Sequence, residues 1–302
     1  MKLHFSDEVS GALHFERPIV ALESTVIAHG LPFPRNIETA YKLERIIRER
    51  DVTPATIALF DGEIHVGIND EQIETLATSG DIIKLSVRDL PGAISFGKSG
   101  ATTVAATATI AKLAGIRVFA TGGIGGVHRG GGHDISADLL VLARTPLVVV
   151  CSGAKSILDI EATREALETL GITVLGWQCD ELPGFYSRSA KFRVDQRVED
   201  AREAAAIVLT RDNLGLNSAI LLTVQVPEAS ALDSDEIEVV LETSMKEAEN
   251  NRVSGKEVTP FLLASLEKAT AGKTLEANIS LLENNARVAA EVAKAVNQAV
   301  SV

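Results

Sequence analysis

Short apolar runs alternate along this chain with longer segments in which apolar residues recur every three or four positions. The runs lie at residues 18–22, 82–87, 118–120, 147–151, 172–177 and 219–226. Several of them pass directly into small and polar residues, as buried strands do where they open into loops at their carboxyl ends. The segments between them predict helices, so the alternation indicates an α/β fold. We predict one α/β domain over residues 1–302, with a central mixed, mostly parallel sheet flanked by helices.

Two further parts of the pattern depart from that alternation. Residues 56–66 give a hairpin signal, two apolar runs joined by Asp61-Gly62. From residue 233 onward the chain is predicted to be helical, at 235–250, 259–271 and 274–300, and these helices should cover the sheet. The last of them carries three asparagines, one of which could face a ligand, at positions 278, 284 and 285.

Composition and charge restrict the class of protein. The chain has 29 Lys and Arg against 41 Asp and Glu, a net charge of −12, which argues against nucleic acid as the main partner. No stretch reaches the roughly 18 apolar residues that span a bilayer, so no membrane role is expected. Cys151 and Cys179 are interpreted as small core residues, not a disulfide framework. We therefore expect a cytoplasmic protein in a reducing compartment.

Candidate chemistry gathers after the central runs, where ligands bind in open α/β sheets. Lys155 follows the run 147–151, and Ser156 to Asp159 predicts a capping box that opens a helix over 156–170. The positive end of that helix would disfavour an ammonium and leave more free amine. Lys155 is then a nucleophile, a phosphate ligand or a solvated charge.

Other charged residues follow or interrupt the predicted strands. Glu23 follows the first strand and is either a helix cap or an acid/base group. Lys84 interrupts an apolar run, so it either points out of the sheet edge or donates to a phosphate. Asp134 and Asp138 could hold a hard cation. Before them the chain has glycines at positions 122, 123, 125, 126, 130, 131 and 132. These glycines would let the backbone approach an anion. The alternative is that the segment is only a flexible turn.

One segment matches the pattern of a phosphate-binding P-loop. Residues Gly92 to Ser99 satisfy G-x-x-x-x-G-K-[ST]. A P-loop needs a strand that ends at its first glycine, but residues 88–91 intervene, and Gly100 would weaken the helix that should follow over 99–113. We predict that this is not a nucleotide site, and keep a P-loop phosphotransferase as the alternative.

Seven longer motifs, in order and across nearly the whole chain, resemble one known family. They are VALESTVIAHGLPFPRNIETA, KLSVRDLPGA, GKSGATTVAAT, VFATGGIGGVHRG, DISADL, CSGAKSILDIEAT and VTPFLL. Together they are similar to the pseudouridine-5′-phosphate glycosidases. Two departures are modest: Ser152 stands where the family usually has alanine, and residues 224–228 differ from an Asn-Pro-x-Pro-Glu segment.

The resemblance implies a role for each matching residue. Lys155 matches the family's nucleophile, Glu23 its proton donor and Asp134 its manganese ligand, with one ion per subunit and magnesium as a possible substitute. Asp138 is in addition our candidate for moving a proton on the base or a metal-bound water. The implied substrate contacts are Lys84, Val104, Thr121, His128, Ser136, Ala137, Asp138 and Asn278.

The resemblance also implies an activity. A lyase of this family cleaves the carbon–carbon glycosidic bond of pseudouridine 5′-phosphate, reversibly, to uracil and ribose 5-phosphate. Glu23 protonates the ring oxygen as Lys155 attacks the anomeric carbon, and a Schiff base lets the bond to uracil break. The family further implies a homotrimer with a small-molecule substrate. A catalytically silent sugar-phosphate-binding protein is the other alternative, and the lyase hypothesis requires Lys155 and Glu23 to share a cavity.

Overall fold

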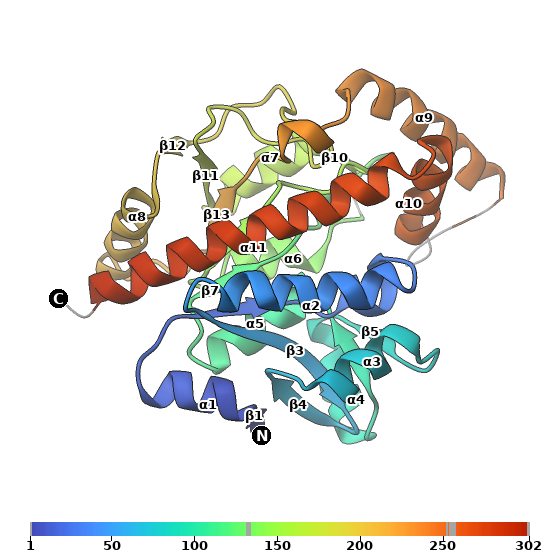
Figure 1. The fold of residues 1–302 in the computed structure, drawn as a ribbon. Helices are drawn as coiled ribbons and strands as arrows, with labels where there is room; N and C mark the ends of the chain where they lie inside the picture. The colour runs from blue at the N-terminus through green and yellow to red at the C-terminus, as the bar shows by residue number, and fades with distance from the viewer. Residues whose placement is uncertain (1, 131–133, 252, 254–257, 301–302) are drawn as a thin grey trace.

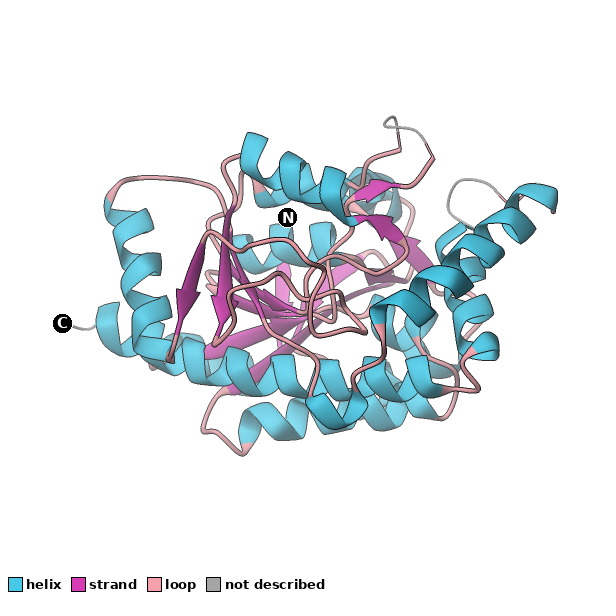
Figure 2. Ribbon diagram, turned by 90° about the horizontal axis from the view of Figure 1, so that it is seen from above, coloured by secondary structure: helices cyan, strands magenta, loops and turns pink. Residues whose placement is uncertain are grey.

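A central sheet lies between two layers of helices (Figures 1 and 2). The computed structural model describes residues 2–130, 134–251, 253 and 258–300. The strands are β1 (Leu3–Phe5), β2 (Ile19–Leu22), β3 (Thr53–Phe60), β4 (Glu63–Val66), β5 (Ile83–Leu85), β6 (Gly100–Thr102), β7 (Val118–Ala120), β8 (Val127–His128), β9 (Val148–Cys151), β10 (Leu158–Asp159), β11 (Thr173–Trp177), β12 (Gln196–Val198) and β13 (Ile220–Thr223). The helices are α1 (Asp7–His14), α2 (Arg35–Arg48), α3 (Asp70–Thr78), α4 (Leu90–Ser95), α5 (Val104–Leu113), α6 (Ala137–Leu142), α7 (Ile160–Thr169), α8 (Ala201–Asn213), α9 (Ser234–Asn250), α10 (Val258–Ala269) and α11 (Lys273–Val300), with the short turns η1 (Val26–Gly30), η2 (Val87–Asp89) and η3 (Glu228–Ser230).

The strand order of the sheet confirms the predicted fold class. It runs β1-β4-β3-β2-β7-β9-β13-β11-β12, and β6 joins β5 to β3. All pairs from β3 through β2, β7, β9, β13 and β11 to β12 are parallel, whereas β3 pairs antiparallel with β4 and β6. Every residue of β2, β7, β9 and β13 is buried, which explains why these strands are continuous apolar runs.

The direction of each crossover sorts the helices into two layers. The connections through α2 and α8 step one way along the sheet, and those through α6 and α7 step the other way, with α5 packed against α6. Because crossovers between parallel strands are right-handed, the two groups lie on opposite faces. The long helix α11 packs against α2 and α8 and covers β2, β7 and β9, as expected of the C-terminal helices (Figure 1).

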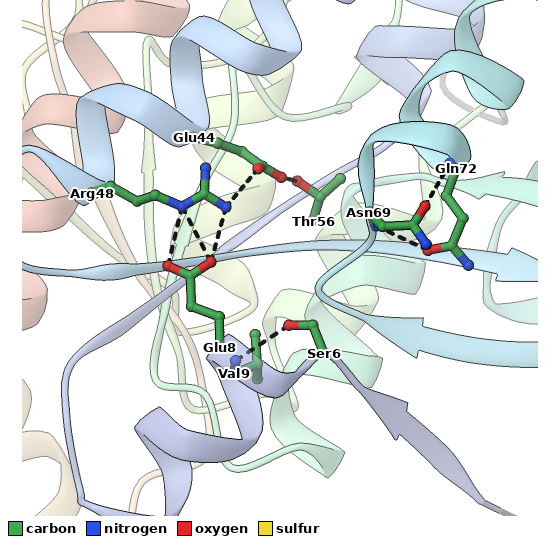
Figure 3. A network of polar contacts seen from close by, with 8 residues as sticks. All are labelled: Ser6, Glu8, Val9, Glu44, Arg48, Thr56, Asn69 and Gln72. Atoms are coloured by element: carbon green, nitrogen blue, oxygen red, sulfur yellow. Dashed lines mark hydrogen bonds and ion pairs between the residues drawn. The ribbon is translucent and has the colours of Figure 1, made fainter.

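A polar network fixes the first helices to the sheet (Figure 3). The buried carboxylate of Glu44 accepts a 2.6 Å hydrogen bond from the Thr56 hydroxyl and lies 3.0 Å from the guanidinium of Arg48. The same guanidinium donates to Glu8 of α1 at 2.9 Å. This chain of contacts connects α1, α2 and β3, and burial raises the pKa of the Glu44 carboxyl.

Two predicted elements are wrong in extent. The apolar run 82–87 is a strand only at β5, and the helix predicted over 99–113 is divided into β6 and α5. The division follows from Gly100, because a Cβ there would lie 2.5 Å from the Leu85 side chain. Only glycine allows β6 to approach β5 so closely, and α5 then begins after Thr103, whose hydroxyl accepts from the amide of Ala106.

The segment from Gly92 to Ser99 is not a P-loop. Gly92 lies inside α4, and no strand ends at it in the part of the chain that the structure describes. Lys98 and Ser99 lead into the strand β6, not into a helix N-terminus. The phosphotransferase alternative is therefore wrong. Among the described helices, none is both long and apolar enough to cross a membrane.

Candidate active site

Two neighbouring cavities open at the carboxyl ends of the parallel strands. One has a volume of about 390 Å³ and the other of about 310 Å³. Both are lined by Glu23, Thr25, Lys84 and Lys155, which come from three separate segments of the chain. The structure therefore brings the predicted acid and the predicted nucleophile to a shared cavity, as the lyase hypothesis requires.

The larger cavity, here called the charged cavity, collects most of the predicted substrate and metal residues. Beyond the four shared residues, its predicted members are Val104, His128, Asp134, Ser136, Ala137 and Asp138. The smaller cavity, here called the apolar cavity, has Val26, Phe185, Leu263 and Leu282 in its wall, together with the predicted Asn278. One cavity thus suits an anionic group and the other a flat ring.

Glu23 is held in one orientation by two hydroxyl groups. It follows β2 directly and is only 7% exposed. The Thr121 hydroxyl donates to its Oε1 at 2.5 Å, and the Thr25 hydroxyl donates to its other oxygen. Thr121 was predicted as a substrate contact, but in the structure it is buried and its hydroxyl is bonded to Glu23.

Lys155 is positioned by a loop, not by a helix terminus. Its amide donates to the carbonyl of Ile124 at 3.1 Å, and the amide of Ile124 donates to the carbonyl of Gly153 at 3.0 Å. Gly153 has a φ of +83°, and a Cβ there would lie 2.6 Å from the Pro183 carbonyl oxygen. The loop therefore needs glycine at 153 to reach this place.

The helix predicted directly after Lys155 begins five residues later. The helix α7 starts at Ile160, and Asp159 caps it by accepting from the amide of Ala162 at 2.9 Å. Residues 158–159 form the strand β10, which pairs with β8. Ser156 caps nothing: its hydroxyl is buried and has no hydrogen-bond partner among the described residues. The argument that a helix dipole activates Lys155 is therefore wrong, because no helix starts there.

Asp138 joins three segments around the charged cavity. It is 7% exposed, and its two carboxylate oxygens accept from the amides of Ala105 at 2.9 Å and Gly125 at 2.7 Å. Its own amide donates to the hydroxyl of Ser136 at 3.2 Å. These bonds hold the start of α5, with Val104, beside the glycine loop. Glycines 131 and 132 of that loop lie outside the described residues.

Several cavity residues were missed by sequence reasoning, and four of them carry charged, aromatic or bulky side chains. Arg88 lines the charged cavity, and His29, Phe185 and Leu263 line the apolar one. Burial, and to a smaller degree the positive charge of Lys84, lowers the pKa of His29. Arg88, His29 and Leu263 stand in the motifs quoted above and Phe185 stands in a loop, but nothing in the pattern says which side chain turns inward.

The remaining singled-out residues are structural. Cys151 and Cys179 are buried free thiols, and burial raises their pKa values to about 12 and about 11. Neither thiol is therefore ionised near neutral pH, which confirms their interpretation as core residues. Of the three asparagines of α11, Asn278 lines the apolar cavity, whereas Asn284 donates to the carbonyl of Gln225 and Asn285 is fully buried.

Asp134 fits a metal ion that keeps most of its water. Its carboxylate is exposed and lines the charged cavity. No group of three or more His, Cys, Asp or Glu able to hold an ion occurs among the described residues. A single carboxylate suits hydrated magnesium or manganese, which bind through one or two carboxylates plus a substrate phosphate.

Comparison with known proteins agrees with this geometry over almost the whole chain. A relative from Geobacillus kaustophilus, named pseudouridine-5′-phosphate glycosidase, is 52% identical over 294 residues, 97% of this chain and 98% of its own. A relative of the same name from Caldanaerobacter subterraneus subsp. tengcongensis is 51% identical over 298 residues, covering 98% and 97%. Among solved structures, the prealnumycin C-glycosynthase AlnA in complex with ribulose 5-phosphate superposes with a TM-score of 0.92 at 40% identity, over 99% of this chain and 98% of that one. An indigoidine synthase A-like protein from Thermotoga maritima gives 0.90 at 39%, over 98% and 96%.

The fold and the two cavities define an α/β enzyme with a candidate active site at the carboxyl ends of parallel strands. A family model described as indigoidine synthase A like protein matches residues 8–295. The chain belongs to this family, which includes the proteins named pseudouridine-5′-phosphate glycosidase, and the resemblance seen in the sequence motifs is confirmed.

Proposed function

We propose that this protein cleaves the carbon–carbon glycosidic bond of pseudouridine 5′-phosphate and releases uracil and ribose 5-phosphate. The observation that carries the proposal is the shared position of Lys155 and Glu23 on both cavities. The names of the relatives and the ribulose 5-phosphate bound to the C-glycosynthase support the same substrate class, a sugar phosphate joined to carbon.

The first step opens the sugar ring. A uracil carbon is a poor leaving group for the two-carboxylate route of ordinary glycosidases. In the proposed step the amine of Lys155 forms a bond to C1′, the bond from C1′ to the ring oxygen breaks, and Glu23 gives its proton to that oxygen. The nitrogen then returns one proton to the Glu23 carboxylate, and the product is an open-chain amine that still carries uracil on C1′.

The second step breaks the carbon–carbon bond. A proton adds to C5 of uracil, the bond from C1′ to C5 breaks, and its electrons return to the pyrimidine ring. The lone pair of the Lys155 nitrogen forms the double bond of a Schiff base at C1′. Water then adds to C1′ and frees ribose 5-phosphate and the lysine. Asp138 is the candidate for moving a proton, and its two bonds to backbone amides would fix it in place.

The two cavities divide the substrate between them. The charged cavity would take the ribose phosphate, with Lys84 as a donor and the N-terminus of α5 at Val104 facing the anion. The apolar cavity would take uracil against Phe185, with the amide of Asn278 to hydrogen-bond the base. A manganese or magnesium ion, one per subunit, would be held at Asp134 and supply positive charge for the phosphate.

Release of uracil and trapping of the lysine test the proposal together. The protein should release uracil from pseudouridine 5′-phosphate, and borohydride with ribose 5-phosphate should add one reduced sugar phosphate to the peptide that contains Lys155. Lys155→Ala should abolish both, a loss of at least about 10³-fold, because no other group forms the Schiff base. Lys98→Ala, an exposed lysine that lines neither cavity, is the matched control.

The outcomes separate the alternatives. Binding of ribose 5-phosphate without uracil release would favour a catalytically silent sugar-phosphate-binding protein. Uracil release with the adduct on another residue would overturn only the role of Lys155 and would leave the proposed activity standing.

Assembly, direction and location are part of the same proposal. A homotrimer is expected from the family, and the exposed side chains of Ile135, in the wall of the charged cavity, and of Leu140 on α6 would support contact between subunits. Light scattering should give three chain masses. Incubation of uracil with ribose 5-phosphate should form the nucleotide if the reaction is reversible. The free thiols support a cytoplasmic location.

A further inference from the structure

A buried amide of α11 connects the two strand ends that carry the site. Asn285 is 0% exposed. The two N–H groups of its side-chain nitrogen are shared among three acceptors, the carbonyl of Thr121 at 2.9 Å, the carbonyl of Gly122 at 3.3 Å and the hydroxyl of Ser152 at 3.1 Å. The side-chain oxygen of Asn285 lies 3.2 Å from the same Ser152 hydroxyl. One side chain therefore contacts the residues that follow β7 and the first residue after β9.

Each of these contacts leads directly to a reacting group. The carbonyl of Thr121 accepts from Asn285, and the hydroxyl of Thr121 donates to Glu23. Asn285 is therefore connected to the proposed acid through one residue. Ser152 begins the loop that ends at Lys155. The amide of Ser152 also donates to the carbonyl of Gly122 at 2.8 Å, which links the two strand ends beneath the amide of Asn285.

We propose that Asn285 is a positioning residue that sets the distance between the acid Glu23 and the nucleophile Lys155. The inference rests on the proposed function. The same helix places Asn278 and Leu282 in the wall of the apolar cavity, four and three residues apart along one face. The face of α11 that would meet the base thus also fixes the two groups that react.

Only an amide satisfies this position. The side chain has two N–H donors and one acceptor, and it meets two carbonyls and a hydroxyl. A carboxylate would set lone pairs against the carbonyls, and an apolar side chain would leave buried carbonyls without donors. The Ser152 hydroxyl adds a further contact to the amide.

The test is a double-mutant cycle on uracil release. Asn285→Ala should lower kcat by about tenfold or more and leave KM within about twofold, because the reacting groups shift while the binding walls remain. In a Thr121→Val background the same change should cost only about two- to fivefold, since the path through Thr121 is already broken and the contact with Ser152 remains.

Two further variants keep the test decisive. Val292→Ala removes a buried side chain two helical turns further along α11 and should lower stability without changing kcat. Ser152→Ala removes one contact of Asn285 and should lower kcat by about two- to fivefold. This variant tests the positioning role even if Asn285→Ala fails to fold.

The outcomes are distinguishable. Two results with an active wild type would overturn the positioning role. In the first, Asn285→Ala and Ser152→Ala lower stability but leave kcat unchanged, as Val292→Ala does. In the second, the falls in kcat of Asn285→Ala and Thr121→Val multiply in the double variant. A wild type that releases no uracil would overturn the proposed function and this inference with it.

Discussion

The hydroxyl of Thr121 donates a 2.5 Å hydrogen bond to Oε1 of Glu23, although the two residues are 98 positions apart in the chain. The sheet makes this contact possible: β2 and β7 are parallel neighbours, with Leu22 opposite Ala120. Glu23 is the residue that follows β2, and Thr121 is the residue that follows β7, so the two lie next to each other. Parallel pairing in the centre of the sheet thus fixes the orientation of the proposed acid.

The contact predicts the effect of removing one hydroxyl. Thr121→Val keeps the shape of the side chain and removes the donor to Glu23, so kcat for uracil release should fall by about ten- to a hundredfold, the range expected when a catalytic group is misplaced. KM should change by less than about threefold, because Thr121 lies behind Glu23 and not in the cavity wall. Thr121→Ser, which keeps the hydroxyl, is the control. Equal rates for the valine and serine variants would show that the hydrogen bond has no role.

Asp138 gives a prediction on stability. Asp138→Asn replaces one of two acceptor oxygens by an N–H donor that would face a backbone amide, either Ala105 or Gly125. The free energy of unfolding should fall by about 1–3 kcal/mol, the cost of leaving a buried donor without its partner, as measured by urea denaturation. Asp134→Asn, at an exposed carboxylate of the same cavity, should change it by less than about 0.5 kcal/mol. Similar values for the two variants would count against the anchoring role of Asp138.

The pKa of Glu44 predicts a pH dependence of stability. Burial raises the pKa of this carboxyl above 4.5, and the opposing hydrogen bonds from Thr56 and Arg48 do not cancel that rise (Figure 3). The folded state then keeps the proton to a higher pH than the unfolded state does. The stability that Glu44 contributes is fully present below pH 4.5 and is lost as the pH rises through the raised pKa.

A variant that does not titrate makes this dependence visible. Glu44→Gln keeps an oxygen to accept from Thr56 and has no charge to bury. The unfolding free energy of the wild type, minus that of the variant, should therefore decrease from about pH 4 to about pH 7. Urea denaturation at intervals across this range measures it. A constant or increasing difference would mean that burial does not dominate the titration of Glu44.

The sequence predicted the fold because its central strands are buried on both faces. Runs such as those that became β9 and β13 can only be interior strands, and the helices between them follow from the alternation. The same pattern also predicted that candidate chemistry lies at the carboxyl-end edge of the sheet, since Glu23 and Lys155 follow such strands. The structure places Glu23 and Lys155 in shared cavities at this edge, and the roles of both residues stay predictions.

The failures have a common physical origin in tertiary contacts that the local pattern does not record. The helix start predicted at Ser156 was displaced to Ile160 because Leu158 pairs with His128, thirty positions earlier. The strand at Gly100 formed because β5 and β3 are available as partners on both sides. Phe185 enters the apolar cavity from a loop without periodicity, and only the folded chain shows which way it points.

The carboxylate of Asp134 leads to a prediction on metal dependence. With a net charge of −12, the protein needs local positive charge to hold a phosphate, and Lys84, Arg88 and an ion at Asp134 would provide it in the charged cavity. Asp134→Ala should raise KM by about ten- to a hundredfold and leave kcat within about threefold, because the ion would bind substrate in the ground state and the transition state alike.

Manganese titration separates the metal role from simple charge removal. Added manganese should lower the raised KM of Asp134→Ala only in part, since the ion then has water and phosphate as its remaining ligands. Asp81→Ala removes an exposed carboxylate that lines neither cavity, and its KM and metal dependence should equal those of the wild type. Chelator should raise the KM of the wild type toward that of Asp134→Ala without adding to the defect of the variant. If Asp134→Ala instead showed the KM of the wild type and its response to chelator, the ion would have to bind elsewhere. Removal of a carboxylate that holds the ion must weaken the binding of the substrate phosphate.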